Sequence, residues 1–415
     1  MRSSSLILLF AAALLSEGFA KNGSNMASKP EVESGQLRIH ENVEGTEADK
    51  EKQEVKQKPK LAKEDNECPC SVPNIWLDIF FLIDSSTAMT STGFDYAMAF
   101  VQSTLLPMTV GQKLGQNTRV GFITYGDTAE LHYNLSHWKS TKDLLSSMNI
   151  TFKSTRGTNI EAAIRLANAN FVEPHHRPNA RKVIVIIASA FEPSTFTDPS
   201  VQAATFKEDG GVIITLENIQ VHGAPVSMLE TLATPGYALS NRDSKIEVWM
   251  LHQLFCRANC FCPMHYRAYS IKDTVPRGGC YRKSMLPAVQ ELAEISCRRH
   301  YKGVIATVDS QEKARFLLKG ECMIRPAKSL WIGMRYIENS YTWYSDQNIA
   351  NPTFKMWAPK YPDQQQGICV KMMAAEDGET KDYSGFWYNE RCRKDLLYIC
   401  QVVACSTENY CPLIR

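Results

Sequence analysis

The stretch Trp76-Leu-Asp-Ile-Phe-Phe-Leu-Ile83, followed at once by Asp84-Ser-Ser-Thr-Ala88, decides how the first half of this sequence folds. A run as apolar as the first is typical of a strand covered on both faces of a parallel sheet. Three further apolar runs share this character, at 120–125, 183–187 and 212–216, and helical patterns accompany them at 94–106, 159–169 and 201–208. The alternation predicts an α/β fold with a doubly wound, mostly parallel sheet.

Oxygen-bearing side chains directly follow the first predicted strand, at the sheet edge where open parallel sheets bind ligands. In Asp84-Ser-Ser-Thr-Ala88 a carboxylate is followed by hydroxyl groups, and such hard oxygen ligands suit a cation such as magnesium. Gly157-Thr-Asn159 begins a later helix. Together these residues resemble the von Willebrand factor type A domain and its metal-ion-dependent adhesion site, over residues 72–240.

The resemblance implies a set of metal ligands that this sequence keeps only in part. Asp84, Ser86 and Thr158 match the family motif, whereas Ala88 replaces its last serine and Ser189 replaces its second aspartate. A methyl group cannot coordinate a cation, and losing a carboxylate removes charge that balances a divalent ion. We therefore expect Asp84 and Thr158 to cap turns and helix starts. A divalent cation, Mg²⁺ or Ca²⁺, on Asp84, Ser86 and Thr158 is the alternative.

Beyond residue 250 the sequence changes to short segments rich in cysteine and tryptophan, with one clear helical pattern at 287–299. The segments are, in order, Cys280-Tyr281, Ala293 to Cys297, Trp331-Ile-Gly-Met334, Trp343-Tyr-Ser-Asp346, Cys369-Val370, Trp387 to Cys392 and Ile399-Cys400. Together they resemble the C-type lectin-like domain over residues 261–402. The resemblance implies a small α+β fold held by disulfides.

The same resemblance implies three disulfides, Cys297–Cys400, Cys369–Cys392 and Cys262–Cys280. Of the 13 cysteines, seven are then left without an assigned partner: Cys68, Cys70, Cys256, Cys260, Cys322, Cys405 and Cys411. Because seven is odd, at least one of them is free or bonded to another chain. A disulfide-linked oligomer is therefore one of the open alternatives. Zinc binding by Cys256, Cys260, Cys262 and His265 is set aside in favour of disulfides.

Calcium-dependent sugar binding in the lectin family uses oxygen ligands that this sequence largely lacks. The family triplet is replaced by Tyr361-Pro-Asp363, Gly367 stands where a glutamate is expected, and Tyr388-Asn389 follows the motif tryptophan. Only Asp363 keeps a carboxylate, and Asn389 is a neutral substitute. Since Ca²⁺ takes six to eight oxygens, we expect any binding here to be independent of calcium.

Aromatic residues stand near the lost calcium ligands. We assign Trp343, Trp357 and Trp387 to the core, and leave Tyr361 and Tyr388 open between the core and a binding face. The acidic loop Glu376-Asp-Gly-Glu379 with Asp382 is interpreted as solvated rather than as a new calcium site.

The N-terminal region carries signals of export. Arg2, an apolar run at 6–15 and small residues at 18 and 20 predict a secretory signal peptide at 1–20. Residues 21–66 mix acidic and basic side chains without any aromatic residue, which predicts a disordered charged arm. Residues 241–260 are interpreted as a cysteine-containing linker and 403–415 as a tail. Asn22, Asn134 and Asn149 begin glycosylation sequons.

Composition excludes several classes of function. The 46 Lys and Arg residues against 44 Asp and Glu residues leave a formal charge of +2, so no strong field points to nucleic acid. No apolar run is long enough to predict a membrane span, and no catalytic motif appears.

The combination of the two domains behind a signal peptide resembles a family of secreted nematode proteins associated with innate defence. It implies a secreted, non-catalytic protein that recognises glycan or protein surfaces, microbial surfaces among them. The alternative is a structural matrix or adhesion component that a leftover cysteine crosslinks.

Overall fold

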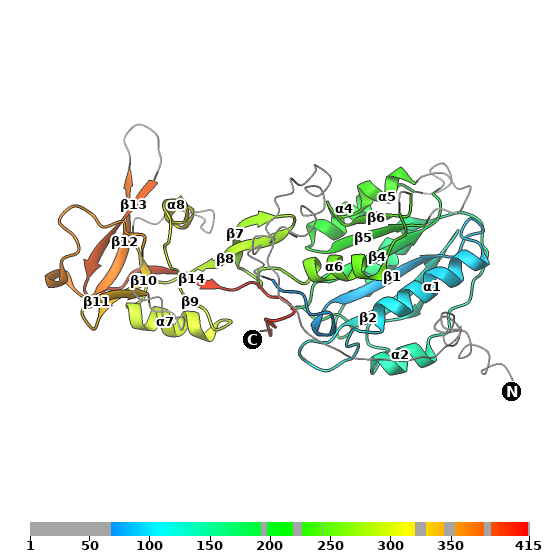
Figure 1. Cartoon of the computed structure of the whole chain (residues 1–415), viewed down its shortest axis with the longest axis horizontal. Helices are drawn as coiled ribbons and strands as arrows, with labels where there is room; N and C mark the ends of the chain where they lie inside the picture. Colours follow the sequence, from blue (N-terminus) through cyan, green and yellow to red (C-terminus); the bar gives the residue numbers. More distant parts are fainter. Residues whose placement is uncertain are drawn as a thin grey trace, which may run out of the picture. The chain divides into compact units, whose positions relative to one another are not determined.

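The computed structural model describes residues 68–191, 197–218, 226–242, 244–319, 329–343, 353–376 and 383–413 (Figure 1). Several predictions made from the sequence fall outside these ranges: the signal peptide at 1–20, the arm at 21–66, the sequon at Asn22, and the acidic residues Asp377, Glu379 and Asp382. None of the helices in the described ranges has the length and apolar character needed to cross a membrane.

The first domain is built on a six-stranded sheet with the order β3-β2-β1-β4-β5-β6. All neighbouring strands run parallel except β3, which is antiparallel to β2. The strands are β1 (Asp78–Asp84), β2 (Arg119–Tyr125), β3 (Ala129–Tyr133), β4 (Lys182–Ala188), β5 (Val212–Glu217) and β6 (Ala238–Ser240). This topology confirms the predicted doubly wound, mostly parallel sheet.

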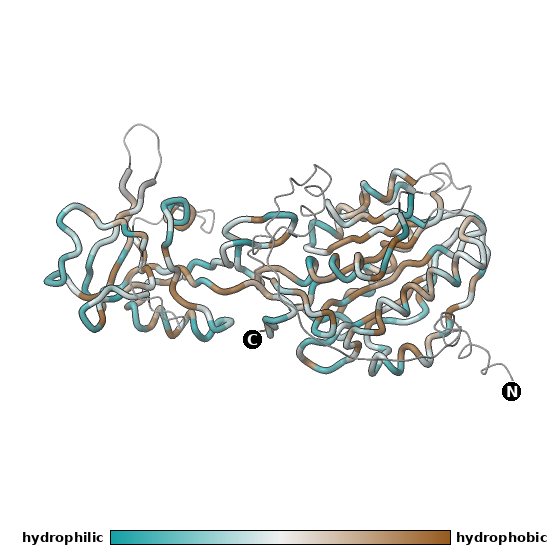
Figure 2. The backbone as a smooth tube through the Cα atoms, viewed as in Figure 1, coloured by the Kyte–Doolittle hydropathy of each residue, from teal (hydrophilic) through white to brown (hydrophobic). Residues whose placement is uncertain are grey.

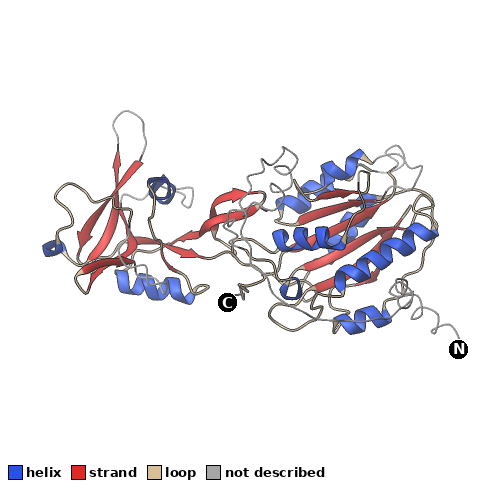
Figure 3. Ribbon diagram, in the orientation of Figure 1, coloured by secondary structure: helices blue, strands red, loops and turns tan. Residues whose placement is uncertain are grey.

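Helices cover both faces of this sheet (Figure 3). They are α1 (Ser91–Leu105), α2 (Thr141–Ser147), α3 (Ile160–Asn170), α4 (Ser200–Glu208), α5 (Ser227–Leu232) and α6 (Val248–Ala258). Alternate side chains of β1 enter two separate cores, because successive residues of a strand point to opposite faces. Phe81 packs in the core shared with α1 and α6, whereas Phe80 packs in the core shared with α3, α4 and α5. Figure 2 shows the central strands as a hydrophobic band.

The segment interpreted as a linker, 241–260, differs from that interpretation. It forms α6, and Leu251, Leu254 and Phe255 of this helix are buried in the same core as Phe81. These positions follow the i, i+3, i+4 spacing of an amphipathic helix. The helix is thus part of the first domain.

The second domain has an eight-stranded sheet with the path β13-β12-β10-β14-β8-β7, to which β11 and β9 add on β10 and β14. The strands are β7 (Arg267–Lys272), β8 (Val275–Lys283), β9 (Val304–Ile305), β10 (Ser329–Ile337), β11 (Ser340–Trp343), β12 (Cys369–Glu376), β13 (Tyr383–Glu390) and β14 (Leu397–Val402). Two helices, α7 (Gln290–Arg299) and α8 (Gln311–Lys319), accompany the sheet. The predicted α+β fold is confirmed.

Six disulfides connect the described segments. The second domain contains Cys297–Cys400, Cys369–Cys392 and Cys262–Cys280. Three more bridges join Cys68 to Cys260, Cys70 to Cys256 and Cys405 to Cys411. They use 12 of the 13 cysteines, and the thirteenth, Cys322, lies outside the described residues.

Trp76 lies just before β1 and contacts two segments that are far from it in the sequence, the end of α6 and the tail. Its backbone N–H donates to Asn259 Oδ1 at 2.7 Å, and its indole N–H donates to the carbonyl of Ser406 at 2.8 Å. Its ring lies 5.4 Å from that of Phe261 and 4.8 Å from that of Tyr410. The side chain is fully buried, so the start of β1 is fixed to the end of α6 and to the tail.

We expect Trp76→Ala to lower the free energy of unfolding by about 3–5 kcal/mol, because it removes a large buried ring and leaves the Ser406 carbonyl without its donor. Denaturant unfolding followed by circular dichroism measures this loss. Trp249→Ala is the matched control, since Trp249 is 56% exposed; it should cost less than about 0.5 kcal/mol. Equal losses in the two variants would contradict the role given to Trp76.

Candidate functional site

The first candidate site lies at the carboxyl end of β1, where Asp84 is fully buried. Asp84 Oδ1 accepts a hydrogen bond from the backbone of Ser86 at 2.8 Å. Asp84 Oδ2 accepts two, from the backbone N–H of Ser189 at 3.1 Å and from its hydroxyl at 2.7 Å. Burial raises the pKa of Asp84, and the hydrogen bonds from Ser189 and Ser86 offset only part of that effect.

Ser189 thus does the opposite of what an aspartate would do in its place. An aspartate would add a second negative charge facing a cation, whereas the Ser189 hydroxyl donates to Asp84 and occupies an oxygen that a cation would need. Thr158 is buried beside α3, but the cap of that helix is Asn159, whose Oδ1 accepts from Ala162 N at 3.1 Å. The expected helix cap at Thr158 is therefore one residue off.

The second candidate site surrounds Asn389 on β13, and its amide group is fully used inside the fold. Asn389 Oδ1 accepts from the backbone N–H of Asp363 at 2.8 Å. Its Nδ2 donates to the hydroxyl of Tyr341 at 2.9 Å and to the carbonyl of Gly367 at 2.8 Å. Asn389 is 3% exposed. It holds the loop of residues 363–367 against the sheet, and its oxygen is not directed to a ligand.

Gly367 and Asp363 also have structural roles. Asp363 Oδ1 accepts from Gln365 N at 3.0 Å and so starts the short helix η3 (Gln364–Gln366). Gly367 has φ 138°, in the region that favours glycine, and a Cβ atom there would lie 2.2 Å from the carbonyl oxygen of Glu390. A glutamate, the calcium ligand of the family at this position, does not fit on this backbone.

Tyr361 and Tyr388 form a ring pair beside this loop. Their ring centroids lie 4.9 Å apart at 73°, an edge-to-face arrangement. Both side chains are half-buried, so each keeps part of its surface exposed. Lys371 Nζ lies 5.9 Å from the Tyr388 ring and 2.7 Å from a carboxylate oxygen of Glu390.

The three tryptophans assigned to the core differ in burial. Trp387 is fully buried and Trp343 is 6% exposed, whereas Trp357 is half-buried. The rings of Trp343 and Trp357 each lie 5.7 Å from that of Trp387. Trp357 therefore lies at the edge of the core. None of these three tryptophans is exposed beside Tyr361 and Tyr388.

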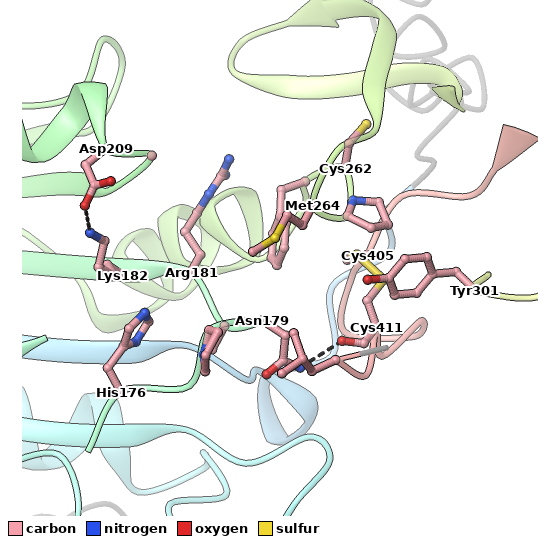
Figure 4. A pocket seen from close by; sticks show the side chains of 16 residues that line it. His176, Asn179, Arg181, Lys182, Asp209, Cys262, Met264, Tyr301, Cys405 and Cys411 are labelled. Carbon is pink, nitrogen blue, oxygen red and sulfur yellow. Dashed lines mark hydrogen bonds and ion pairs between the residues drawn. A yellow bond between two sulfur atoms is a disulfide. The ribbon is translucent and has the colours of Figure 1, made fainter. Parts of the chain in front are cut away.

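A pocket of about 270 Å³ lies where the first domain meets the segment after α6 and the tail (Figure 4). Its polar side chains already have partners: Asn179 donates to the Cys411 carbonyl at 2.8 Å, Arg181 donates to the Ala258 carbonyl at 3.2 Å, and Lys182 forms an ion pair with Asp209. Arg181 also lies over the Phe261 ring. These groups hold the segments together.

His176, which also lines that pocket, belongs to a buried charge cluster. Its Nδ1 lies 2.9 Å from Asp78 Oδ2, and Arg177 donates to both oxygens of the same carboxylate. Burial alone would raise the pKa of Asp78, but the hydrogen bond from His176 and the charge of Arg177 outweigh burial and hold the pKa below its usual value. The cluster fixes the start of β1.

A second cavity, of about 820 Å³, was not anticipated from the sequence. It lies between α1 and the segment before α6, and it is lined mainly by apolar side chains that include Tyr96, Phe100 and Ile246. Among the described residues, no group of three or more His, Cys, Asp or Glu side chains gathers in a way that could hold a metal ion. Of the described sequons, Asn149 is exposed, whereas Asn134 Oδ1 accepts from Ser136 N at 3.1 Å.

Comparison with known proteins identifies both halves of the chain. Residues 78–248 match the von Willebrand factor type A domain and residues 289–402 match the Lectin C-type domain. C-type lectin domain-containing protein 160 of Caenorhabditis elegans is 23% identical over 363 residues, which are 83% of this chain and 56% of that protein. E-selectin of Canis lupus familiaris is 31% identical over 116 residues, 28% of this chain and 18% of that protein. The chain thus spans about half the length of the nematode relative and less of the selectin.

Two solved structures align with parts of this chain. Proximal thread matrix protein 1 from the mussel byssus, with a zinc-occupied MIDAS motif, aligns at a TM-score of 0.37 and 18% identity, over 45% of this chain and 46% of that one. A calcium-independent type II antifreeze protein aligns at a TM-score of 0.26 and 20% identity, over 34% of this chain and 95% of that one.

We expect magnesium to leave the thermal midpoint unchanged, because Ala88 offers no oxygen, Ser189 offers no carboxylate, and the Ser189 hydroxyl donates to Asp84. Thermal unfolding with magnesium and with a chelator measures the difference. A midpoint that rises by several degrees with magnesium would show that Asp84, Ser86 and Thr158 are sufficient.

The double variant Ala88→Ser, Ser189→Asp should gain a magnesium-dependent rise in stability, because it restores a hydroxyl and a carboxylate beside Asp84. At a hundredfold excess of Mg²⁺ over its dissociation constant the gain is about 2.7 kcal/mol. Adding Asp84→Asn to the double variant is the control and should abolish the response. A double variant that ignores magnesium would mean that more than two ligands separate this site from a working one.

Proposed function

Because the chain joins a von Willebrand factor type A domain to a C-type lectin domain, we propose that it is a secreted recognition protein without catalytic activity. It binds glycan or protein surfaces through the second domain and needs no bound cation to do so. Both families act mainly in binding rather than in catalysis. Export is supported by the N-terminal signal pattern and by the six disulfides, which persist in oxidising compartments.

The proposal of calcium independence rests on the hydrogen bonds that the side-chain amide of Asn389 makes within the protein. Each polar atom of its side chain has a partner within the fold. A calcium ion at this position would have to break the bond from Asp363 N and would find no glutamate at Gly367. Since Ca²⁺ requires six to eight oxygens, the loop is better suited to holding its own shape than to holding an ion.

The tyrosine pair supplies the contact surface in this proposal. Tyr361 and Tyr388 keep partly exposed rings in a fixed edge-to-face geometry. Such rings pack on the apolar face of a sugar or on a protein side chain, and their fixed geometry lowers the entropy lost on binding. Lys371, near the Tyr388 ring and paired with Glu390, keeps charge close to this surface.

We further propose that the protein acts in innate defence and that its ligands are microbial surfaces. The pairing of the two domains supports it, together with a relative in a nematode whose name also specifies a C-type lectin domain. Glycosylation at the exposed Asn149 would be consistent with export.

The second candidate function is a structural matrix or adhesion component. The odd number of 13 cysteines supports it, because Cys322 remains after six disulfides are formed and could join two chains. Non-reducing and reducing gels of the secreted protein separate the two proposals. Covalent oligomers on the non-reducing gel favour the matrix component, and a single monomeric band favours the recognition protein.

We expect binding to survive chelation and to weaken when either tyrosine of the pair is truncated. A screen of glycans and bacterial surfaces, run with and without a chelator, identifies the ligand. Tyr361→Ala and Tyr388→Ala should each then lower affinity by roughly thirtyfold, equal to about 2 kcal/mol, if these rings are contact residues. Tyr96→Ala is the matched control, since Tyr96 is 72% exposed on α1 of the first domain, and should bind like the parent.

Loss of binding in chelator would reject calcium independence. Unchanged affinity in both tyrosine variants, with the chelator result as expected, would reject the tyrosine pair as the contact surface but leave cation-independent recognition intact.

A further inference from the structure

Within the described residues, helix α7 packs one of its faces into the second domain. Ala293 and Cys297 are fully buried on that face. On the opposite face Leu292 is 57% exposed and Ile295 is 41% exposed. Because residues three apart are neighbours on a helix surface, these two side chains form one exposed apolar stripe.

Two more exposed apolar side chains precede the helix in the chain. Met285 is 88% exposed and Leu286 is 76% exposed. Single exposed apolar side chains are ordinary, but a group of them bordered by charge marks an interaction surface. We call Met285, Leu286, Leu292 and Ile295, with the charged residues around them, the α7 face.

The charges of the α7 face lie at opposite ends of the helix. Glu291 lies in the first turn and Arg298 and Arg299 in the last. Arg298 is held by Glu294 at 2.5 Å, whereas neither Glu291 nor Arg299 forms an ion pair with any residue in the described ranges. Eight residues separate them, about 12 Å along the helix axis. A shallow hollow of about 320 Å³ lies between them, lined by Glu291, Glu294, Ile295, Arg298 and Arg299.

We propose that the α7 face is an interface between two copies of this chain. A surface with an acid at one end, a base at the other and an apolar centre is complementary to itself when two copies meet antiparallel about a twofold axis. With the axis near Ile295, Glu291 of each copy faces Arg299 of the other. Ile295 meets its equivalent and Leu292 packs beside it in the hollow.

We infer that a second copy, and not an unrelated protein, covers the α7 face. Both partners of the proposed ion pair, Glu291 and Arg299, are present on this one helix, so two copies complement each other. A single helix pair covers less than the roughly 1,600 Å² of a standard stable interface, so we expect a reversible dimer with a dissociation constant in the micromolar range. The dimer does not depend on the ligand or on Cys322. It would give each particle two copies of the second domain, and paired weak sites gain effective affinity for a repeated surface.

Sedimentation velocity of the full secreted chain over a concentration series tests the proposal. The parent should shift from monomer to dimer as concentration rises, and denaturing non-reducing gels should show that the dimer is not covalent. Glu291→Lys and Arg299→Glu each place like charges opposite one another across the axis, so each should raise the dissociation constant at least tenfold. Ile295→Ser should do the same by removing the apolar centre.

Swapping the two charges tests the antiparallel pairing more directly than the single variants do. The double variant Glu291→Lys, Arg299→Glu restores both ion pairs and should dimerise like the parent. A mixture of the two single variants should form a heterodimer, since lysine and arginine of one copy then face two glutamates of the other. Glu312→Lys is the matched control, because Glu312 also lies exposed in the first turn of a helix; it should leave the dimer unchanged.

A parent that stays monomeric at every concentration would overturn the proposal, as would a dimer that Ile295→Ser and both single charge variants leave intact. Failure of the double variant and of the mixture to recover would overturn the antiparallel pairing. Circular dichroism of each variant, expected to match the parent because all three positions are exposed, excludes unfolding as the cause of a lost dimer.

Discussion

The burial of β1 on both faces is the constraint on which the first domain depends. All seven of its residues are buried, including an aspartate at each end, so every polar group on the strand must find a partner within the protein. At the start, Asp78 is satisfied by His176 and Arg177; at the end, Asp84 is satisfied by Ser86 and Ser189. The same requirement explains why Ser86 and Ser189 both donate to Asp84, although the buried Ser86 hydroxyl itself has no hydrogen-bond partner among the described residues.

The two buried aspartates respond to pH in opposite directions because their partners differ in charge. The hydrogen bond from His176 and the charge of Arg177 outweigh burial and keep the pKa of Asp78 below the ordinary 3.8. The stabilising effect of Asp78 is present above that value and is lost as pH falls through the lowered pKa. Asp84 has only neutral donors, and burial raises its pKa above 3.8. Its contribution is therefore present below 3.8 and is lost as pH rises through the raised pKa. At neutral pH, Asp78 therefore strengthens the fold, while Asp84 weakens it.

The sequence predicted the strands that a local apolar pattern indicates. Such a pattern does not predict contacts between residues that are far apart in the chain. The strands at 120–125, 183–187 and 212–216 lie within a residue or two of β2, β4 and β5, because continuous apolar runs are direct evidence of double-sided burial. The linker interpretation of residues 241–260 is wrong for α6, because Leu251, Leu254 and Phe255 have helical spacing and pack in the core of the first domain. The role of Asn389 could not be predicted, since it depends on Tyr341, 48 residues away. The partners of Cys68 and Cys70 lie 192 and 186 residues away, and no local pattern specifies such pairs.

The proposed function does without a bound cation, and this would change what kind of recognition the chain carries out. A calcium ion is held by six to eight oxygens, and in the proposed function the chain recognises its ligand without such an ion, because Asn389 Oδ1 already accepts from Asp363 N. In that proposal the contacts are the rings of Tyr361 and Tyr388, and aromatic contacts discriminate little by charge. A protein that recognises through such contacts gains most from repetition, because linked weak sites multiply in effect on a repeated surface. The proposed cation-independent contacts and the proposed pairing of two α7 faces therefore favour the same solution, in which affinity comes from the number of sites and not from the strength of one.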